Sequence, residues 1–164
     1  MNVIRLGFTG TRHGMTTAQM TAVHDYAAYV RTVNDCEDIE RYEWHHGDCV
    51  GSDAQSHVIA TVLRCWTVVH PPVNGKLRAW CEGDQILPAR DYLSRDWDIV
   101  HDTGELIATP KDFSPVRRTG GTWTTIGYAV RLGRPVRVCL PDGTWKDGSG
   151  FFGALLPAIP GRFS

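Results

Sequence analysis

Three glycine-rich turns constrain this chain more than any other feature, because each follows an apolar, strand-like run and precedes a helix-like pattern. They cover residues 10–12, 47–53 and 119–124. In a parallel α/β sheet such turns open on one edge, at the carboxyl ends of the strands. Backbone N–H groups and helix dipoles bind anions there. The repetition therefore predicts a pocket for a phosphorylated, nucleotide-like molecule.

Hydrophobic periodicity predicts five strands that alternate with helices. The expected strands are residues 3–9, 42–46, 66–70, 105–109 and 136–140. This alternation implies an α/β fold, a Rossmann-like, doubly wound, mainly parallel five-stranded sheet with helices on both faces. We expect the strand order 3-2-1-4-5, numbered along the chain. Residues 1–164 are expected to form a single domain, with an irregular aromatic tail at 142–164.

Helix starts carry recognisable signatures. Thr16 with Gln19, and Ser52 with Gln55, have the pattern of capping boxes. Pro88 suits the first turn of a helix, which predicts that the helix before the fourth strand starts there. The side chains expected on the buried side of the helix after the second turn are Ala54, Val58, Val62 and Cys65.

The bulk composition excludes several classes of protein. The net charge of −1 gives no global attraction to nucleic acid or to an anionic membrane. No apolar run approaches the roughly 20 residues that span a bilayer, and the first residues lack the order of a signal peptide. We therefore expect a cytoplasmic protein without a membrane partner.

The cysteines indicate reduced thiols, because their number is odd and their spacing is wide. They are Cys36, Cys49, Cys65, Cys81 and Cys139. His45, His46 and Cys49 lie close in sequence, but adjacent strand residues point to opposite faces, and the paired spacing of structural zinc ligands is missing. We predict no metal site and no cofactor.

The first two turns supply candidate ligand contacts of different kinds. Gly10 allows close backbone approach, Thr11 offers a hydroxyl, and Arg12 suits a bidentate phosphate contact. In the second turn Asp53 occupies a helix start, where its carboxylate suits ribose hydroxyls better than phosphate. His57 shares a helix face with Asp53. The other second-turn residues expected at the ligand are Gly47, Asp48, Gly51 and Ser52.

The third turn combines glycines, hydroxyls and a following helix, which suits an anion. Its expected ligand contacts are Thr119, Gly120, Gly121, Thr122, Trp123 and Thr124. Trp123 has two interpretations, a ring that stacks on a base or a core side chain. Arg78 and Arg95 are predicted to add positive charge to the pocket. If they lie around the same pocket, four other basic residues add to it: Lys76, Arg90, Arg117 and Arg118.

Together these segments resemble the SLOG superfamily of Rossmann-like nucleotide-binding domains, which includes the Lonely Guy (LOG) phosphoribohydrolases and the Rossmann domain of DNA-processing protein A. Similarity to the latter covers nearly all of residues 1–141 in order. Residues 47–57 resemble its Gly-Gly-Ala-Arg-Gly-Ile-Asp-Ala…His segment, and residues 95–100 its Arg-Asn-Arg-x-Ile-x helix. Residues 119–140 resemble its Ser-Gly-Ser/Thr…Ala…Gly-Arg-x-Val stretch. The resemblance implies nucleotide binding, a homodimer and a role in conflicts between bacteria and phages.

The departures from these families affect the expected function. LOG enzymes carry Pro-Gly-Gly-x-Gly-Thr-x-x-Glu, whose glutamate belongs to the active site. Here Ile126 and Gly127 stand where the acids would be, so LOG-type hydrolysis loses its carboxylate. In the arginine helix, Asp96 and Trp97 replace the asparagine and the second arginine, which weakens a role in binding single-stranded DNA.

The function expected first is therefore that of a pure binder, a sensor or sponge for a nucleotide-like small molecule. Phosphate is expected at the three turns, ribose near Asp53, and the base near Trp123 or the 71–87 loop. One alternative is a nucleotide N-glycosidase or phosphoribohydrolase-like hydrolase with Asp53 or Glu82 as its acid. A second is a single-stranded DNA-binding module. The aromatic tail is expected to dock on the core or on a partner subunit through Phe151, Phe152, Leu155 and Leu156.

Overall fold

The computed structural model describes residues 2–35, 38–115 and 121–152. Its centre is a seven-stranded sheet with the order β4-β3-β2-β1-β5-β6-β7. The strands are β1 (Val3–Gly10), β2 (Arg41–His46), β3 (Trp66–Val69), β4 (Gln85–Ile86), β5 (Glu105–Thr109), β6 (Val136–Cys139) and β7 (Trp145–Asp147). Neighbouring strands pair in parallel, except that β7 runs antiparallel to β6.

The predicted α/β architecture is confirmed, and so is its strand order. The five expected strands are β1, β2, β3, β5 and β6, and they lie in the order β3-β2-β1-β5-β6. The count of five is wrong, because β4 and β7 add one short strand at each edge. These strands contain two and three residues, which is too short for an alternating pattern to show in the sequence.

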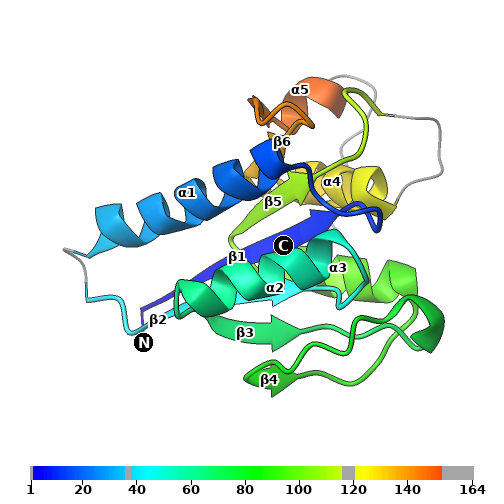
Figure 1. Cartoon of the computed structure of the whole chain (residues 1–164), viewed down its shortest axis with the longest axis horizontal. Coiled ribbons are helices and arrows are strands. Elements are labelled where there is room, and N and C mark those ends of the chain that lie inside the picture. Colours follow the sequence, from blue (N-terminus) through cyan, green and yellow to red (C-terminus); the bar gives the residue numbers. More distant parts are fainter. Residues whose placement is uncertain (1, 36–37, 116–120, 153–164) are drawn as a thin grey trace.

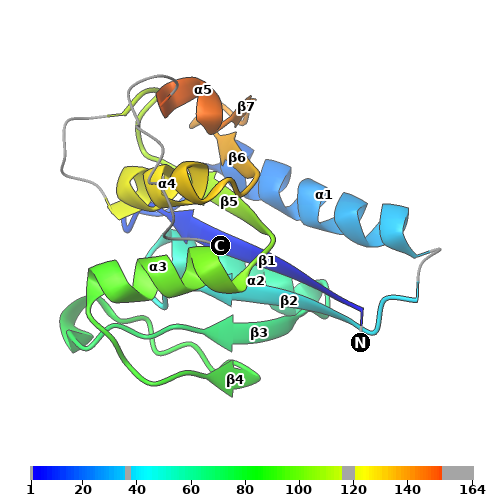
Figure 2. The ribbon, with the colours of Figure 1, turned by 180° about the vertical axis from the view of Figure 1, so that it is seen from behind.

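Four main helices cover the sheet in two layers. Figure 1 shows α1 (Thr17–Asn34) and α2 (Ser52–Val62) on one face. Figure 2 shows α3 (Tyr92–Asp102) and α4 (Gly121–Leu132) on the other. The short α5 (Ser149–Phe152) packs against α4, and a 3-10 turn, Gly75–Leu77, lies in the loop after β3. None of the helices in the described ranges combines the length and apolar composition that a bilayer crossing requires.

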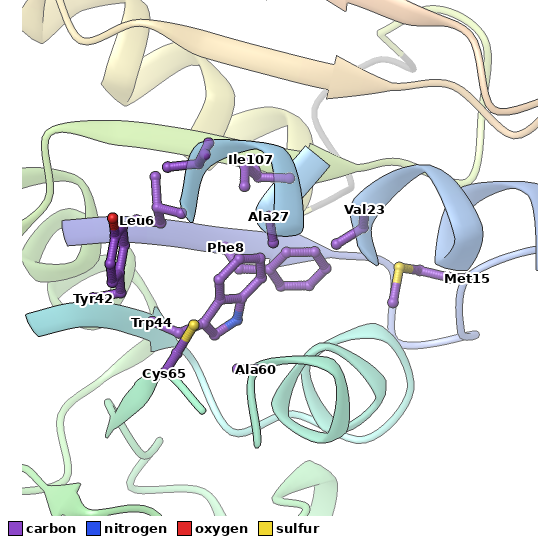
Figure 3. Close-up of a cluster of buried hydrophobic side chains, with 11 residues drawn as sticks. Leu6, Phe8, Met15, Val23, Ala27, Tyr42, Trp44, Ala60, Cys65 and Ile107 are labelled. Carbon is purple, nitrogen blue, oxygen red and sulfur yellow. The ribbon is translucent and has the colours of Figure 1, made fainter. Parts of the chain in front are cut away.

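Each face of the sheet has its own hydrophobic core. Under α1 and α2, Phe8 of β1 stacks on Trp44 of β2 with ring centroids 5.7 Å apart, and Val23 and Ala27 of α1 cover them (Figure 3). The second core joins α3 and α4 to β5 and β6. Its buried members include Ile99, Val100, Leu106, Ala108, Trp123, Ile126 and Val138. The two cores hold the helices against the sheet, and so they hold the turns that join strands to helices at its edge.

The helix starts agree with the sequence prediction in one case of three. At α1, Thr16 and Gln19 form the predicted capping box. At α2 the N-cap is Gly51, and no side chain caps it, so the box predicted at Ser52 is wrong. The start predicted at Pro88 is also wrong, because α3 begins at Tyr92 behind the N-cap Asp91.

The second helix also turns a different face inward. Val58 and Val62 are 61% and 66% exposed, whereas Ser52, Asp53, Ser56 and Ala60 form the buried side. Hydrogen bonds explain the polar inner face, because Ser56 Oγ accepts from Trp44 Nε1 at 3.2 Å and Ser52 Oγ donates to the Thr11 carbonyl at 2.6 Å. The predicted inner face is therefore wrong for Val58 and Val62, whereas Cys65, just after the helix, is buried in the core as predicted.

Candidate functional site

The first two turns pack directly against each other at the carboxyl edge of the sheet. The N–H of Ser52 donates to the carbonyl of Thr11 at 3.1 Å. A Cβ on Gly10 would lie 2.4 Å from Ser52 Cβ and 2.4 Å from Thr109 Oγ1. A Cβ on Gly51 would lie 2.2 Å from the Arg12 carbonyl oxygen. These glycines thus bring β1, α2 and the end of β5 into contact, as the pattern of turns predicts.

The start of α4 joins the same edge through Arg95 and Asp96 of α3. Arg95 Nη1 donates to the Gly47 carbonyl at 2.8 Å, and Nη2 donates to Asp96 Oδ1 at 2.8 Å. A Cβ on Gly121 would lie 3.9 Å from the other Asp96 oxygen. The first turn of α4 also contains Thr124 and the buried Thr122. The predicted contacts Thr119 and Gly120 lie outside the described residues.

Asp48 and Arg78 pair with each other and fasten the long loop to the second turn. Asp48 Oδ2 accepts from Arg78 Nε at 2.7 Å, and Oδ1 accepts from the Cys81 N–H at 2.9 Å. The Asp48 side chain is fully buried. The sequence predicts both residues as ligand contacts, and the structure shows that their charges neutralise each other.

Arg95 is likewise neutralised rather than free. Its side chain is buried, and it contacts Cys49 Sγ at 3.3 Å in addition to Gly47 and Asp96. Burial alone would lower the pKa of Arg95, but the carboxylate of Asp96 outweighs it, so the guanidinium stays charged. Arg12 differs, because it is exposed and makes no ion pair within the described ranges.

Asp53 is a buried acid with an unusual proton affinity. It is 5% exposed, and its Oδ2 accepts from the Cys49 N–H at 3.1 Å. Burial raises the pKa of its carboxyl to about 7, although the charge of Arg95 and the Cys49 hydrogen bond oppose the rise. At neutral pH, Asp53 is therefore present in both protonated and ionised forms, at the start of a helix where a carboxylate would repel an anion.

Two buried hydroxyls at this edge have no hydrogen-bond partner among the described residues. Thr109 Oγ1 ends β5 beside Gly10, and Tyr92 Oη belongs to the first turn of α3. The Tyr92 ring lies under the Arg95 guanidinium, 4.7 Å from its carbon. Buried polar atoms in proteins nearly always have a partner. Both of these exceptions lie near the converged turns.

Trp123 belongs to the core. It is 7% exposed, and its ring meets that of Phe151 edge-on with centroids 5.1 Å apart. Of its two predicted interpretations, this placement favours the core side chain over the base-stacking ring. Phe152 also packs on this core, so the described part of the tail docks on its own chain. Leu155 and Leu156 lie outside the described residues.

Four of the seven histidines form two pairs on opposite faces of β2, because adjacent strand residues point to opposite faces. His46 Nε2 lies 3.0 Å from His57 Nδ1, and Cys81 is close enough to complete a set of metal-ligand types. However, the Asp48 N–H donates to His46 Nδ1 at 3.1 Å, which places the His46 proton on Nε2, facing His57. Both nitrogens of His46 are then engaged in hydrogen bonds, so this arrangement favours a hydrogen-bonded pair over a metal site.

The second histidine pair belongs to a chain of hydrogen bonds that the sequence did not reveal. Glu43 Oε2 lies 3.0 Å from His45 Nε2, and His45 Nδ1 lies 3.0 Å from His70 Nε2. All three residues are buried. His70 also lines a small cavity of about 130 Å³ with Leu87, Pro88, Arg90, Arg95 and Asp98. Only the parallel register of β2 and β3 brings His45 and His70 together, and no local pattern reveals it.

A larger hollow of about 580 Å³ lies at the opposite edge, where β2 and β3 begin. Its lining mixes both charges and includes Arg31, Arg41, Arg64, Asp35, Glu40 and Asp84. We place the candidate site at the glycine turns despite the greater size of this hollow, because the unpartnered hydroxyls and the uncapped start of α2 are at the turns. Glu82 lines the hollow, so it is not positioned to act as an acid at the turns.

Comparison with known proteins defines the fold. No protein-family model matches the sequence, and no curated protein matches it. A molybdenum cofactor binding protein from Rippkaea orientalis has a TM-score of 0.63 at 15% identity, covering 85% of this chain and 78% of its own. DNA processing protein A from Helicobacter pylori has a TM-score of 0.59 at 13% identity, covering 91% and 71%. The chain therefore has the same fold as these two proteins.

A third solved structure has the same fold. The molybdenum cofactor carrier protein from Chlamydomonas reinhardtii has a TM-score of 0.58 at 14% identity, covering 93% of this chain and 84% of its own. The predicted resemblance is thus confirmed for the fold. At such low identity the likeness concerns the fold alone, so the ligand has to be argued from the residues at the carboxyl edge.

Proposed function

We propose that this SLOG-type protein binds a phosphorylated, nucleotide-derived small molecule at the carboxyl edge of its sheet, as a sensor or sponge. The observation that carries the proposal is the pair of unpartnered buried hydroxyls, Thr109 Oγ1 and Tyr92 Oη, beside the converged turns. A bound ligand with several oxygens would supply the partners that these donors lack.

The charge distribution supports an anion at this place. The first turn of α2 has no side-chain cap. Its Ser52 N–H donates to the Thr11 carbonyl, so the turn offers a phosphate its dipole and the N–H groups of Asp53 and Ala54. Arg12 is the exposed cation beside it. Because Arg78 and Arg95 are neutralised by aspartates, the attraction from the described residues comes from the start of α2 and from Arg12; Arg117 and Arg118 lie outside the described residues. We therefore expect moderate affinity that falls with salt.

The structural neighbours support ligand binding in general terms. Two are named for the molybdenum cofactor and one for single-stranded DNA. A single-stranded DNA role is less favoured for this chain, because binding along a phosphate backbone needs a groove of unneutralised positive charge. Within the described ranges, five arginines at or near the sheet pair with acids instead: Arg5, Arg41, Arg78, Arg95 and Arg137.

Replacing Arg12 with alanine is expected to weaken the binding of AMP and of ribose 5-phosphate about three- to tenfold, because a charge-assisted hydrogen bond contributes on the order of 1 kcal/mol or slightly more. Isothermal titration calorimetry at low salt measures the change. Arg131→Ala is the matched control, since this exposed arginine lies in the last turn of α4, at the helix end opposite the site. Equal affinities for both variants would contradict the assignment of Arg12.

A second candidate function is supported by Asp53. A buried carboxyl with a pKa of about 7 is suited to general acid catalysis, for example in releasing a base from a nucleotide. Chromatography of a nucleotide panel after incubation with the protein would detect the free base. Turnover that is lost in Asp53→Asn would replace the pure binder with an N-glycosidase, and unchanged nucleotides would exclude this role for Asp53.

Homodimerisation remains a proposal that rests on the family resemblance. Among the described aromatic side chains of the tail, Phe151 and Phe152 pack on the core beside α4 and Trp145 packs against Tyr26 of α1. Light scattering of the purified chain is expected to give twice the mass of 18.3 kDa. A mass equal to that of one chain would contradict the proposal.

A further inference from the structure

The small cavity behind the second turn has the size and lining of a subsite for one six-membered ring or for the six-membered edge of a purine. It holds about 130 Å³, close to the roughly 150 Å³ of a protein cavity that accommodates benzene. Leu87 and Pro88 provide apolar walls, and Arg90 and Asp98 form an ion pair in the lining. Arg95 belongs both to this lining and to the contact with Gly47, so the cavity adjoins the phosphate-binding turns.

Hydrogen bonds fix which nitrogen of His70 is available in this cavity. Burial opposes the ionisation of Glu43, but hydrogen bonds from His45 and Arg41 outweigh it, so the pKa of this carboxyl lies below its usual value. An ionised Glu43 only accepts, which places a proton on His45 Nε2. Neutral His45 then accepts through Nδ1 from His70 Nε2–H. His70 is left with Nδ1 as an unprotonated acceptor.

This acceptor has no partner in the described part of the chain, although His70 is only 3% exposed. Burial, together with the charges of His45 and Arg95, lowers the pKa of His70 to about 3, so the ring stays neutral at physiological pH. Nδ1 is not among the fully buried polar atoms that lack a partner, so a group in the cavity can reach it. A ligand group that carries an N–H and enters the cavity would satisfy it.

We propose that this cavity receives the heterocyclic ring of the ligand, and that His70 Nδ1 accepts a hydrogen bond from a ring N–H or an amino group. The proposal rests on the proposed function, because the same ligand places its phosphate at the turns. Glu43 and His45 act as positioning residues, since their hydrogen bonds hold His70 in the accepting tautomer. The ligand class is thereby narrowed to N-heterocycles with a donor on the ring edge.

The binding test uses four probes that share a ribose 5-phosphate group. AMP and GMP carry donor groups on the base, purine riboside 5′-monophosphate has the same ring system without an amino group or an edge N–H, and ribose 5-phosphate has no base. We expect AMP or GMP to bind about three- to tenfold more tightly than purine riboside 5′-monophosphate in calorimetry, the range for one hydrogen bond. Equal affinity of all three nucleotides would overturn the proposal.

A matched pair of variants distinguishes loss of the Nδ1 acceptor from loss of the folded structure. The amide of glutamine replaces Nε2 and keeps the donor to His45, whereas the amide of asparagine places its oxygen near Nδ1. We expect His70→Gln to lose the preference for donor-bearing bases while binding ribose 5-phosphate as the wild type does. His70→Asn is expected to keep that preference. A preference that survives in His70→Gln, or a matching loss of ribose 5-phosphate binding, would overturn the role of Nδ1.

Binding of ribose 5-phosphate distinguishes an incorrect ring subsite from an incorrect phosphate site. If ribose 5-phosphate binds and the base adds nothing, the turns bind phosphate and the cavity is not the ring subsite. If none of the four probes binds, the proposed function fails as well. The ¹⁵N chemical shift of His70 Nδ1 gives a readout independent of affinity, because it moves when this nitrogen gains a hydrogen bond. An unchanged shift at saturation with the tighter nucleotide would contradict the proposal.

Discussion

Replacing Gly51 with alanine is expected to lower the free energy of unfolding by about 3 kcal/mol or more, enough to leave little folded protein. Gly51 has φ of 87° and ψ of −123°, a region that is essentially open to glycine alone. The new Cβ would also lie 2.2 Å from the backbone oxygen of Arg12. Relieving this clash requires the first and second turns to separate, which would disrupt the proposed binding site.

Gly133→Ala is the matched control for this experiment. Gly133 also has a positive φ, 74°, but nothing lies within 4 Å of its Cβ position. Its substitution carries backbone strain without a clash, for which we expect about 1 kcal/mol. Denaturant unfolding followed by circular dichroism measures both variants. Equal losses would show that the contact between the turns does not depend on the missing Cβ of Gly51.

Asp53→Asn is expected to remove a pH dependence of stability. The pKa of Asp53 rises from 3.8 in the unfolded chain to about 7 in the fold, so its contribution is fully present below about pH 4 and is lost as the pH rises through 7. A shift of about 3 units at about 1.4 kcal/mol each sets an upper limit of about 4 kcal/mol. The asparagine variant should therefore be more stable than the wild type at pH 8 and similar to it at pH 4.

Unfolding by denaturant at these two pH values tests the expectation, and Asp25→Asn serves as a control because the Asp25 side chain is 71% exposed. The same ionisation should affect the ligand. An ionised Asp53 at the start of α2 repels phosphate, so affinity for ribose 5-phosphate should fall as the pH rises through 7 in the wild type, and less so in the variant. A wild type whose stability increases between pH 5 and 8 relative to Asp53→Asn would contradict the raised pKa.

Much of the fold could be predicted from the sequence because local patterns and topology rules act together. The apolar runs locate the five long strands, and the preference for right-handed crossovers then leaves few possible orders. Thr16 and Gln19 mark the start of α1 through side chains close in sequence. The convergence of the first two turns follows from the same rules, since Gly10 and Gly51 both come after parallel strands.

What the sequence did not reveal depends on contacts between distant residues. An apolar stripe through Val58 and Val62 usually marks the inner face of a helix, yet α2 turns Ser52 and Ser56 inward because Thr11 and Trp44 offer hydrogen bonds. The pairing of His45 with His70 depends on strand register. The neutralisation of Arg78 by Asp48, 30 residues away, is equally invisible in a charge count.

The most direct test of the central claim is a ¹⁵N–¹H correlation titration of the protein with ribose 5-phosphate. If the turns form one phosphate-binding site, the backbone amide signals that move should be those of Thr11, Arg12, Ser52, Asp53 and Thr122, on three segments that meet at the carboxyl edge. Shifts concentrated instead at Arg31, Arg64 and Trp66 would place the ligand in the larger hollow at the opposite edge and contradict the account.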